Sequence, residues 1–539
     1  MKLHFTLARQ HNPSAAWRAP VMSLPVLLIL AACGGNDGGA ESPPVAAVPA
    51  FSTVCGALAG KTVGAGKITA AVMVAATAST AEACNASGEI VSSPASTIKF
   101  RLILPNSQAW NKKLLQFGGA GYNGSIRDIP ADIARRNYAT VASDSGHQGT
   151  VLSLSFALNN TAGFDNFAFA SVPQVYAAAL AGIRLAYDAA PQRKYFYGES
   201  TGGREALQQA QRYPANYDGI VALEPVIDYS AVNQKGIAVQ KRIASAGGAG
   251  WLSPAKVARF DAARLASCDA LDGLADGIIA NPEACVFDPA VLRCPAGADT
   301  GDSCLSDAQL ATVKVLTTNE RLAVPTANGV TTAFQFGIGV EADAAAGWSA
   351  MHFGAAPSPI GSLLGLLSQD WARYAVLGNA SADILAHDPA DYASQWLASS
   401  IKSNANNPDM RAYAERGGKL LLWHGWSDHL VPPMGSIDLY GRTVQAMGTA
   451  GTNAFMRFYL SAGVTHSGTG PGATQTDFLT ALESWVEGGT VPPDALLSKK
   501  PAADGTVALT RPTCRYPSWP RYNGSGDKNA AASFTCVGG

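Results

Sequence analysis

Apolar residues occur along the chain in short runs that alternate with longer segments of helical spacing. Short runs that end in turn-forming residues predict buried strands over 113–117, 138–142, 194–197, 218–223, 419–423 and 455–460. Helical spacing predicts helices over 172–188, 204–213 and 477–487. Because strands alternating with helices form parallel sheets with right-handed crossovers, the pattern predicts an α/β fold with a mainly parallel central sheet.

The alternation is interrupted once, between about residues 229 and 415. Cysteines, glycines, prolines and short mixed helices fill this stretch, and the strand and helix pattern resumes after it. We interpret residues 229–415 as a lid domain inserted between strands of one sheet. The core is then formed by two parts, residues 53–228 and residues 416–539.

The first residues have the pattern of an export signal. Lys2, Arg9 and Arg18 precede the apolar run Val21–Leu30, and small residues follow it, which predicts a signal peptide over 1–32. Leu30-Ala-Ala-Cys33 also resembles a bacterial lipobox, in which Cys33 would be lipidated and would anchor the protein to a membrane. Ordinary secretion is the alternative. The Gly- and Pro-rich residues 33–52 predict a flexible tether. We therefore expect an outer-membrane-anchored or periplasmic lipoprotein, or otherwise a secreted protein.

Composition and charge exclude several classes of protein. Charged residues make up 15% of the 539 residues and hydrophobic residues 47%, which argues against a disordered chain, since roughly 25% charge is average. The net charge is −1 and no block of like charges occurs, so nucleic acid is not an expected partner. Beyond the first 35 residues no apolar run reaches the roughly 18 residues that span a bilayer.

The cysteines indicate disulfide bonds. The chain has nine cysteines, and setting Cys33 aside leaves an even number, as expected for an exported protein. Eight cysteines allow 105 pairings. Proximity along the sequence favours four of them: Cys55 with Cys84, Cys268 with Cys285, Cys294 with Cys304, and Cys514 with Cys536.

The strongest chemical signal follows the strand predicted at 194–197. Gly198-Glu-Ser-Thr-Gly202 has the G-x-S-x-G pattern between a strand and a helix, where small residues permit a tight turn that exposes the serine hydroxyl. Ser200 is the candidate nucleophile. In such folds the oxyanion hole uses the amide that follows the nucleophile, here Thr201, and an amide from an earlier glycine-rich loop, here Gly119.

A serine nucleophile requires a base and an acid that orients the base. Asp428 follows the strand predicted at 419–423, and His466 follows the strand at 455–460, so both lie at the same sheet edge as Ser200. His147 and His424 are weaker candidates for the base, because His147 precedes the serine and His424 precedes the acid. The order Ser200, Asp428, His466 predicts an acyl-transfer triad.

These residues carry a family resemblance. Gly198-Glu-Ser-Thr-Gly-Gly-Arg-Glu205, His424-Gly-Trp-Ser-Asp428 and Gly463-Val-Thr-His466 resemble the tannase and feruloyl esterase family, which includes mono(2-hydroxyethyl) terephthalate hydrolases. The resemblance implies an α/β-hydrolase fold with an inserted lid and hydrolysis of aromatic (phenolic) acid esters, with a small-molecule ester as partner. Terephthalate monoesters, hydroxyalkanoate oligomers or general carboxylic esters are alternative substrates. A non-catalytic binding module of the same fold is a remote alternative.

An acidic loop in the lid is a candidate calcium site. Asp269, Asp272 and Asp276 are spaced by three and four residues with glycines between them, and hard oxygen ligands of this kind suit Ca²⁺. Spacing alone is more typical of a solvated acidic loop than of a calcium site. The resemblance implies structural Ca²⁺ bound by the three aspartates, with Leu274 and Ile278 contributing carbonyl oxygens.

The chain departs from the family at two places. Typical members carry a disulfide between a cysteine before the nucleophile and a cysteine after the histidine, where this chain has Glu199 and Ser467. We expect hydrogen bonds, such as one between Glu199 and Ser467, to replace that bridge. The lid residues Trp371, Arg373 and Tyr374 are a speculative substrate-binding set, with a packed or solvated arginine as the alternative. Because this segment does not match the carboxylate-binding segment of terephthalate-monoester hydrolases, phenolic esters are favoured.

Overall fold

The computed structural model describes residues 50–358, 361–466 and 468–538. The expected signal peptide, Cys33 and Ser467 lie outside the described residues. The expected tether ends earlier than residue 52, because helix α1 (Phe51–Gly56) begins inside it. Phe51 stacks on Tyr187, with ring centroids 5.9 Å apart, and Cys55 is bonded to Cys84, which together hold this segment on the core.

The core contains a 13-stranded sheet whose central part is parallel, as the alternating pattern predicts. The parallel strands, in spatial order, are β6 (Ala139–Ser143), β5 (Lys113–Phe117), β7 (Arg193–Glu199), β8 (Gly219–Leu223), β11 (Lys419–Gly425) and β12 (Met456–Ser461). Their buried residues alternate between the two faces. Ile220 and Ala222 pack on one face, while Val221 and Leu223 pack on the other.

Helices cover both faces of the parallel strands. The apolar sides of α4 (Ser171–Tyr187), α5 (Thr201–Arg212) and α12 (Pro433–Phe455) lie on one face, and α13 (Phe478–Gly488) lies on the other. One continuous helical stretch in the described chain, Thr161–Tyr187, is long and apolar enough to span a membrane. Its most apolar part is 56% buried, and α4 packs on β4 and β6. Its apolar character is therefore explained by its packing on the sheet as a core helix.

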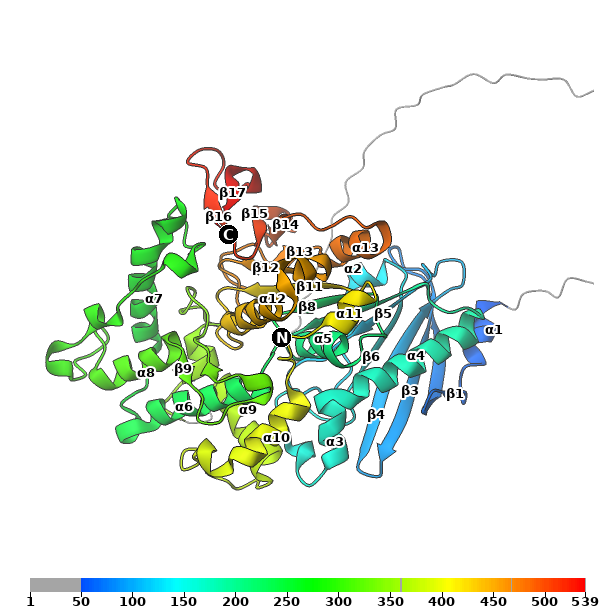
Figure 1. The fold of residues 1–539 in the computed structure, drawn as a ribbon, viewed down its shortest axis with the longest axis horizontal. Coiled ribbons are helices and arrows are strands. Elements are labelled where there is room, and N and C mark those ends of the chain that lie inside the picture. Colours follow the sequence, from blue (N-terminus) through cyan, green and yellow to red (C-terminus); the bar gives the residue numbers. More distant parts are fainter. Residues whose placement is uncertain (1–49, 359–360, 467, 539) are drawn as a thin grey trace, which may run out of the picture.

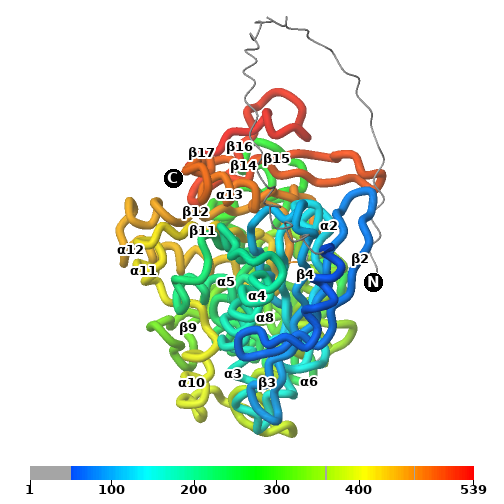
Figure 2. Tube along the Cα trace, turned by 90° about the vertical axis from the view of Figure 1, so that its right-hand side faces the viewer, coloured from blue at the N-terminus to red at the C-terminus, as the bar shows by residue number. Residues whose placement is uncertain are grey.

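Antiparallel strands extend the sheet on both sides, which the hydrophobic pattern did not predict. They are β1 (Thr62–Val63), β2 (Gly66–Val74), β3 (Ala83–Ser93) and β4 (Ser96–Pro105) beside β6, and β15 (Val507–Arg515), β14 (Ala495–Pro501) and β13 (Gln475–Thr476) beside β12. Figure 2 shows the C-terminal strands gathered at one end of the molecule. Strand β3 buries alternate residues and is rich in Ala and Ser, so it forms no continuous apolar run. Strand β2 contains the apolar stretch Ala70–Val74, but Ile68 is its one fully buried residue, so this edge strand differs from the buried runs of the parallel core.

The insertion between β8 and β11 is mostly helical and lies on the side of the molecule away from β1–β4 (Figure 1). Its longer helices are α6 (Tyr229–Gly248), α7 (Pro254–Cys268), α8 (Asp307–Thr317), α9 (Leu363–Asp370) and α10 (Ala393–Ser403). It also contains a two-stranded sheet of β9 (Glu320–Arg321) and β10 (Thr332–Ala333).

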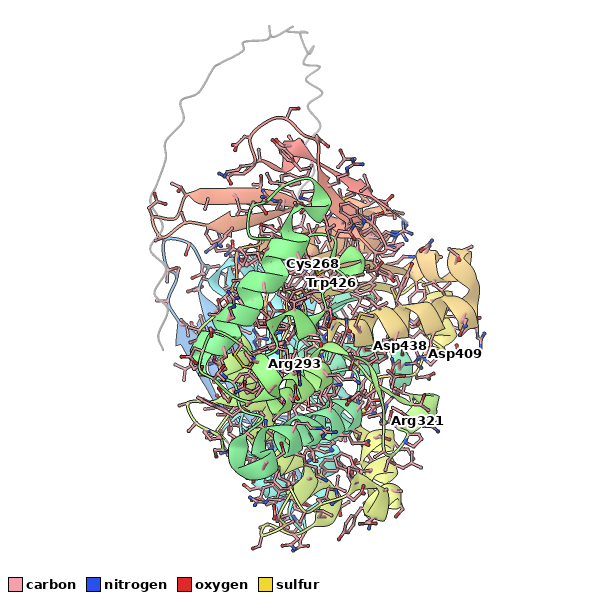
Figure 3. The ribbon with its side chains drawn as sticks, turned by 90° about the vertical axis from the view of Figure 1, so that its left-hand side faces the viewer. Cys268, Arg293, Arg321, Asp409, Trp426 and Asp438 are labelled. Carbon is pink, nitrogen blue, oxygen red and sulfur yellow. A yellow bond between two sulfur atoms is a disulfide. The ribbon has the colours of Figure 1, made fainter. Side chains whose placement is uncertain are left out.

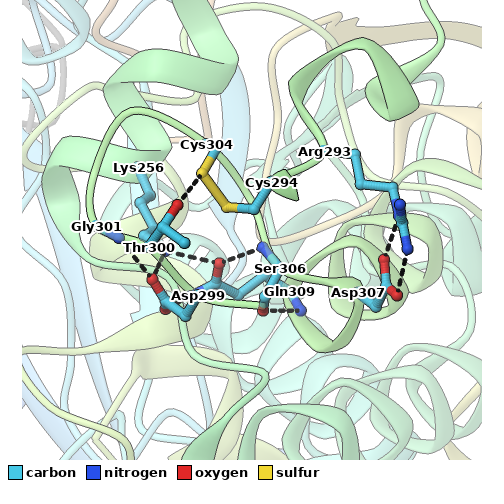
Figure 4. The surroundings of a disulfide bond; sticks show 10 residues. All are labelled: Lys256, Arg293, Cys294, Asp299, Thr300, Gly301, Cys304, Ser306, Asp307 and Gln309. Carbon is cyan, nitrogen blue, oxygen red and sulfur yellow. Dashed lines mark hydrogen bonds and ion pairs between the residues drawn. A yellow bond between two sulfur atoms is a disulfide. The ribbon is translucent and has the colours of Figure 1, made fainter. Parts of the chain in front are cut away.

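The four disulfides predicted from sequence proximity are all confirmed. Cys55–Cys84 fastens α1 to β3, and Cys514–Cys536 fastens β17 (Phe534–Val537) to β15. In the insertion, Cys268–Cys285 fastens the end of α7 to the segment that follows it, and Cys294–Cys304 closes a short loop (Figure 4). Four such bonds place the folded protein outside the reducing cytosol.

Candidate active site

Ser200 lies on the tight turn between β7 and α5. Its backbone has φ 59° and ψ −120°, and its amide donates to the Leu223 carbonyl at 2.9 Å. A side chain on Gly198 would place its Cβ 2.0 Å from the Gly202 carbonyl oxygen, so the turn requires glycine there. The strained backbone holds the Ser200 hydroxyl at the carboxyl end of the sheet.

The structure brings the three predicted side chains into one hydrogen-bonded relay. The Ser200 Oγ lies 2.9 Å from His466 Nε2, and His466 Nδ1 lies 2.7 Å from Asp428 Oδ2. Because an ionised carboxylate can only accept, Nδ1 carries the proton and Nε2 is free to accept the serine proton. Residues separated by 266 positions thus meet because β7, β11 and β12 end at one sheet edge.

Asp428 is held as a carboxylate. Its Oδ1 accepts from the amides of Leu430 and Val431, both at 2.8 Å, and its Oδ2 accepts from His466 and, at 3.1 Å, from His424. Burial raises the pKa of Asp428, but the two histidines outweigh burial and leave that pKa well below its ordinary value. His424 therefore supports the acid and is not the base.

The oxyanion loop differs from the prediction at Gly119. The Gly119 amide donates to Glu205 Oε2 at 2.9 Å and is not available to a substrate. Within the described chain, the amides of Ala120 and Thr201 have no hydrogen-bond acceptor, and both residues line the cavity next to Ser200. The pair of donors is therefore Ala120 with Thr201, because the loop turns the Gly119 amide away towards α5.

Sequence reasoning missed Glu205, the residue that fixes this loop. Its buried carboxylate accepts from the Gly119 amide and, at 3.1 Å, from Asn123 Nδ2. Burial raises the pKa of Glu205, and the nearby Arg204 opposes that rise. The only available signal was an acidic residue on the inner side of a helix that follows a nucleophile turn.

We expect Glu205→Gln to lower kcat about 10- to 100-fold with little change in KM. Gln offers one acceptor in place of two, so it turns a donor towards either Gly119 or Asn123 and displaces the oxyanion loop. Steady-state kinetics on an aryl ester measures the effect, with the exposed Glu415→Gln as a matched control. An unchanged kcat would show that the loop holds its shape without Glu205.

A cavity of about 410 Å³ opens beside Ser200 and His466. Its wall is largely aliphatic and is contributed by both the core and the insertion, through Tyr122, Val151, Leu152, Val226, Tyr229, Val232, Leu363, Leu364, Leu367, Leu430 and Val431. Apart from the relay, Thr201 and the hydroxyl groups of the two tyrosines, the polar side chains of the described lining are Arg127, Glu199 and Asn233. Such a wall suits an apolar acyl or alcohol group next to the reacting ester.

The prediction that three lid residues bind the substrate is wrong. Trp371, Arg373 and Tyr374 are not among the residues that line the cavity. Trp371 is fully buried and stacks on Tyr229 at 4.8 Å between ring centroids, so it supports the wall from behind. Arg373 Nε donates to the Ala382 carbonyl at 2.9 Å. The preceding helix α9 presents Leu363, Leu364 and Leu367 to the cavity, whereas the π-helix Trp371–Leu377 that continues it contributes no lining residue.

The acidic loop of the insertion directs its carboxylates to its own backbone. Asp269 accepts from the amides of Asp276, Gly277 and Ile278, and Asp276 Oδ2 pairs with Arg511 at 2.6 Å. Asp272 is buried, and burial together with the nearby Asp276 and Asp269 raises its pKa to about 7. Among the described residues, the three carboxylates do not bring one oxygen each within 4.8 Å of one another.

The insertion is joined to the loop that carries Asp428. The amides of Gly337 and Ile338 donate to the carbonyls of Asp428 and Trp426 at 2.8 and 3.0 Å. Ser427 Oγ donates to the Ile338 carbonyl at 2.8 Å, and His429 Nε2 donates to the Gly339 carbonyl at 3.0 Å. Figure 3 labels Trp426 on the face where the insertion covers the core. The lid is thus a fixed part of the site.

A doubly covered, centrally parallel sheet with a serine on a strained strand-to-helix turn and an Asp–His relay defines a serine hydrolase of the α/β-hydrolase fold. Comparison with known proteins narrows this class. The family described as "Tannase and feruloyl esterase" matches residues 84–537. The chain belongs to this family and is a carboxylic ester hydrolase acting on small-molecule esters.

Relatives with assigned names agree with this membership. The chain is 32% identical to a mono(2-hydroxyethyl) terephthalate hydrolase from Piscinibacter sakaiensis, covering 87% of each chain. It is 27% identical to feruloyl esterase B of Aspergillus niger, covering 87% of this chain and 89% of that one. Its fold is similar to feruloyl esterase B of Aspergillus oryzae, with a TM-score of 0.79, 24% identity, and coverage of 90% of this chain and 100% of the other.

Proposed function

We propose that the protein hydrolyses esters of aromatic, phenolic acids through an acyl-enzyme formed on Ser200. The observation that carries the proposal is the relay of 2.9 and 2.7 Å from Ser200 through His466 to Asp428 at the wall of an apolar cavity. The named relatives include feruloyl esterases, whose substrate class fits this cavity.

The geometry supports a two-step acyl transfer. His466 Nε2 accepts the Ser200 proton as Oγ attacks the ester carbonyl, and Asp428 stabilises the resulting imidazolium. The amides of Ala120 and Thr201 hold the developing oxyanion. His466 then gives its proton to the leaving alcohol. Water, activated by the same histidine, releases the acid from Ser200.

A panel of methyl ferulate, methyl gallate and mono(2-hydroxyethyl) terephthalate, assayed on the purified protein, tests the substrate class. The highest kcat/KM is expected for a phenolic ester. Terephthalate monoesters are the second candidate, because Arg127 places one cation on the cavity wall, although Glu199 on the same wall opposes a free carboxylate. A clear preference for simple alkyl esters would refute an aromatic substrate class.

The activity should fall as the pH is lowered, and the midpoint of this acid limb of the pH profile should lie above pH 6.5. Burial lowers the pKa of His466, but the charge and hydrogen bond of Asp428 outweigh burial and raise that pKa above its ordinary value. The base is therefore protonated, and inactive, at a higher pH than a free histidine would be. A pH profile of kcat/KM measures the limb, and a midpoint below 6.5 would contradict this balance of effects.

We propose that the loop from Asp269 to Ile278 binds a structural Ca²⁺. Its donors are hard oxygens, and in the described chain no lysine or arginine pairs with Asp269 or with the buried Asp272. Asp269, Asp272 and Asp276 would supply carboxylates, and Leu274 and Ile278 would supply carbonyls. The carboxylates would have to turn from the amides that they now accept from.

Removing calcium should lower the melting temperature. Loss of a ligand that binds only the folded state destabilises by roughly 3 kcal/mol if Ca²⁺ had been present at about 100 times its dissociation constant. Thermal unfolding with excess EGTA, and again after adding back Ca²⁺, measures the shift, and Asp269→Asn should reduce it. An identical melting temperature in both conditions would contradict the site.

We also propose export through the N-terminal signal and lipidation of Cys33. The four disulfides support the export, and the Leu-Ala-Ala-Cys33 motif supports the lipid anchor. Palmitate labelling in a bacterial host should mark the wild type and not Cys33→Ala. Equal labelling of the two proteins would exclude Cys33 as the lipidated residue.

A further inference from the structure

A second carboxyl group lies behind the catalytic histidine. Glu224 follows β8 directly, its side chain is 1% exposed, and its Oε2 lies 3.6 Å from His466 Nδ1. One oxygen of Glu224, one oxygen of Asp428 and Nδ1 of His466 all lie within 4.8 Å of one another. The imidazole therefore faces two acids, and the mechanism above uses one of them.

The backbone fixes Glu224 in this place. Strand β8 lies between the nucleophile strand β7 and the acid strand β11, and the Glu224 amide donates to the Trp423 carbonyl at 2.8 Å. Two residues further, the Val226 amide donates to the Ser200 carbonyl at 3.2 Å. Glu224 itself has a φ of 42°, a conformation that non-glycine residues rarely adopt. The segment that carries Glu224 is thus hydrogen-bonded both to the acid strand β11 and to the nucleophile turn, which keeps its carboxyl group next to the relay.

The two acids are not equivalent. Asp428 accepts four hydrogen bonds, whereas Glu224 Oε1 has no partner in the described part of the chain. Burial, with the charges of Asp428 and Glu199, raises the pKa of Glu224 well above its ordinary value, and the Gly425 amide only partly opposes this. Two adjacent buried carboxyls cannot both ionise easily. The hydrogen bonds and burial therefore favour the charge on Asp428 and the proton on Glu224.

We propose that Glu224 is a reserve acid of the relay: a positioning residue that supports the His466 imidazolium and takes over its Nδ1 when the Asp428 carboxylate is lost. The inference rests on the proposed acyl-transfer mechanism. Without Asp428, Glu224 releases its proton to solvent and its Oε2 accepts the Nδ1–H bond. The Ser200 proton still moves to Nε2 and then to the leaving alcohol, so the proton balance of the reaction is unchanged.

The test is a double-mutant cycle measured as kcat/KM on p-nitrophenyl acetate, with wild type, Asp428→Ala, Glu224→Gln and the double variant. A triad without a reserve loses about 10⁴-fold when its acid is disabled. Here Asp428→Ala should lose about 10²-fold. Glu224→Gln should cost about threefold in the wild-type background and at least about 30-fold in the Asp428→Ala background. Glu415→Gln is the remote, exposed control.

A pH profile separates positioning from a merely structural role. Adding Glu224→Gln to Asp428→Ala removes the second carboxyl group behind His466 and leaves Glu199 as the remaining nearby acid, so the acid limb of kcat/KM should move to lower pH. If Asp428→Ala does not fold, Asp428→Asn, which keeps the side-chain volume, replaces it in the cycle.

Two results would overturn the reserve acid. One is the same factor for Glu224→Gln in both backgrounds, and the other is an acid limb that does not move. Labelling of wild-type Ser200 by a fluorophosphonate probe distinguishes failure of this inference from failure of the proposed function. An unlabelled and inactive wild type would refute the mechanism itself.

Discussion

Ser200→Ala should lower kcat about 10⁶-fold and abolish the burst of alcohol released from an activated aryl ester. Without Oγ no acyl-enzyme forms, and the amides of Ala120 and Thr201 can only orient an ester for attack by water. The fold should be unaffected, because Ala fits the same turn and Ser200 makes its structural hydrogen bond through the backbone. Rapid-mixing kinetics with p-nitrophenyl acetate measures the burst.

The exposed Ser525→Ala is the matched control and should retain the full burst. A fluorophosphonate probe should label wild type and Ser525→Ala but not Ser200→Ala. Retained turnover in Ser200→Ala would assign the nucleophile elsewhere. A wild type that neither labels nor turns over would favour the alternative of a non-catalytic binding module.

Arg264→Ala should give the largest loss of stability, about 3 to 5 kcal/mol, because it leaves a buried carboxylate without its cation. Arg264 of α7 is 5% exposed, and its Nη1 lies 2.5 Å from Oε1 of the fully buried Glu341. The neighbouring Asp261 cannot replace the cation, because a carboxyl group carries no positive charge in either protonation state; burial and Glu341 raise the Asp261 pKa to about 8. Thermal unfolding at pH 7 measures the loss.

The same variant should also reduce activity at temperatures where it is folded. Glu341 lies at the end of the segment 337–341, whose amides donate hydrogen bonds to the loop that carries Asp428. The Oε1 atom of Glu341 accepts a hydrogen bond from the Gly339 amide of this segment at 3.0 Å. Disturbing this segment loosens the support of Asp428 from the insertion.

Arg293→Ala in the same domain is the matched control. Arg293 makes a two-pronged pair with Asp307, but the side chains are 47% and 58% exposed (Figure 4). No measurable change in melting temperature is expected there, because solvent screens an exposed pair. Equal losses in the two variants would contradict the claim that burial makes the Arg264 pair important.

Local patterns were enough to predict the parallel core and the relay. Each parallel strand is a short apolar run, and each relay residue lies in the loop that follows such a run, so Ser200, Asp428 and His466 meet at the ends of their strands. The cysteine pairs were equally accessible, since every bond closes a loop of 29 residues or fewer. These predictions depend on contacts whose geometry the neighbouring sequence already specifies.

The sequence by itself therefore determined the class of chemistry, the order of the relay and the disulfide framework. Only the tertiary structure decided which loop amide is free to bind the oxyanion, because the Gly119 amide donates a hydrogen bond to Glu205, which lies 86 residues further along the chain. It also decided that α9 and not Trp371 faces the substrate, and that Glu224 stands behind His466. The physical reason is that hydrogen bonds and burial between distant segments depend on how helices and loops pack, which no local pattern of residues encodes.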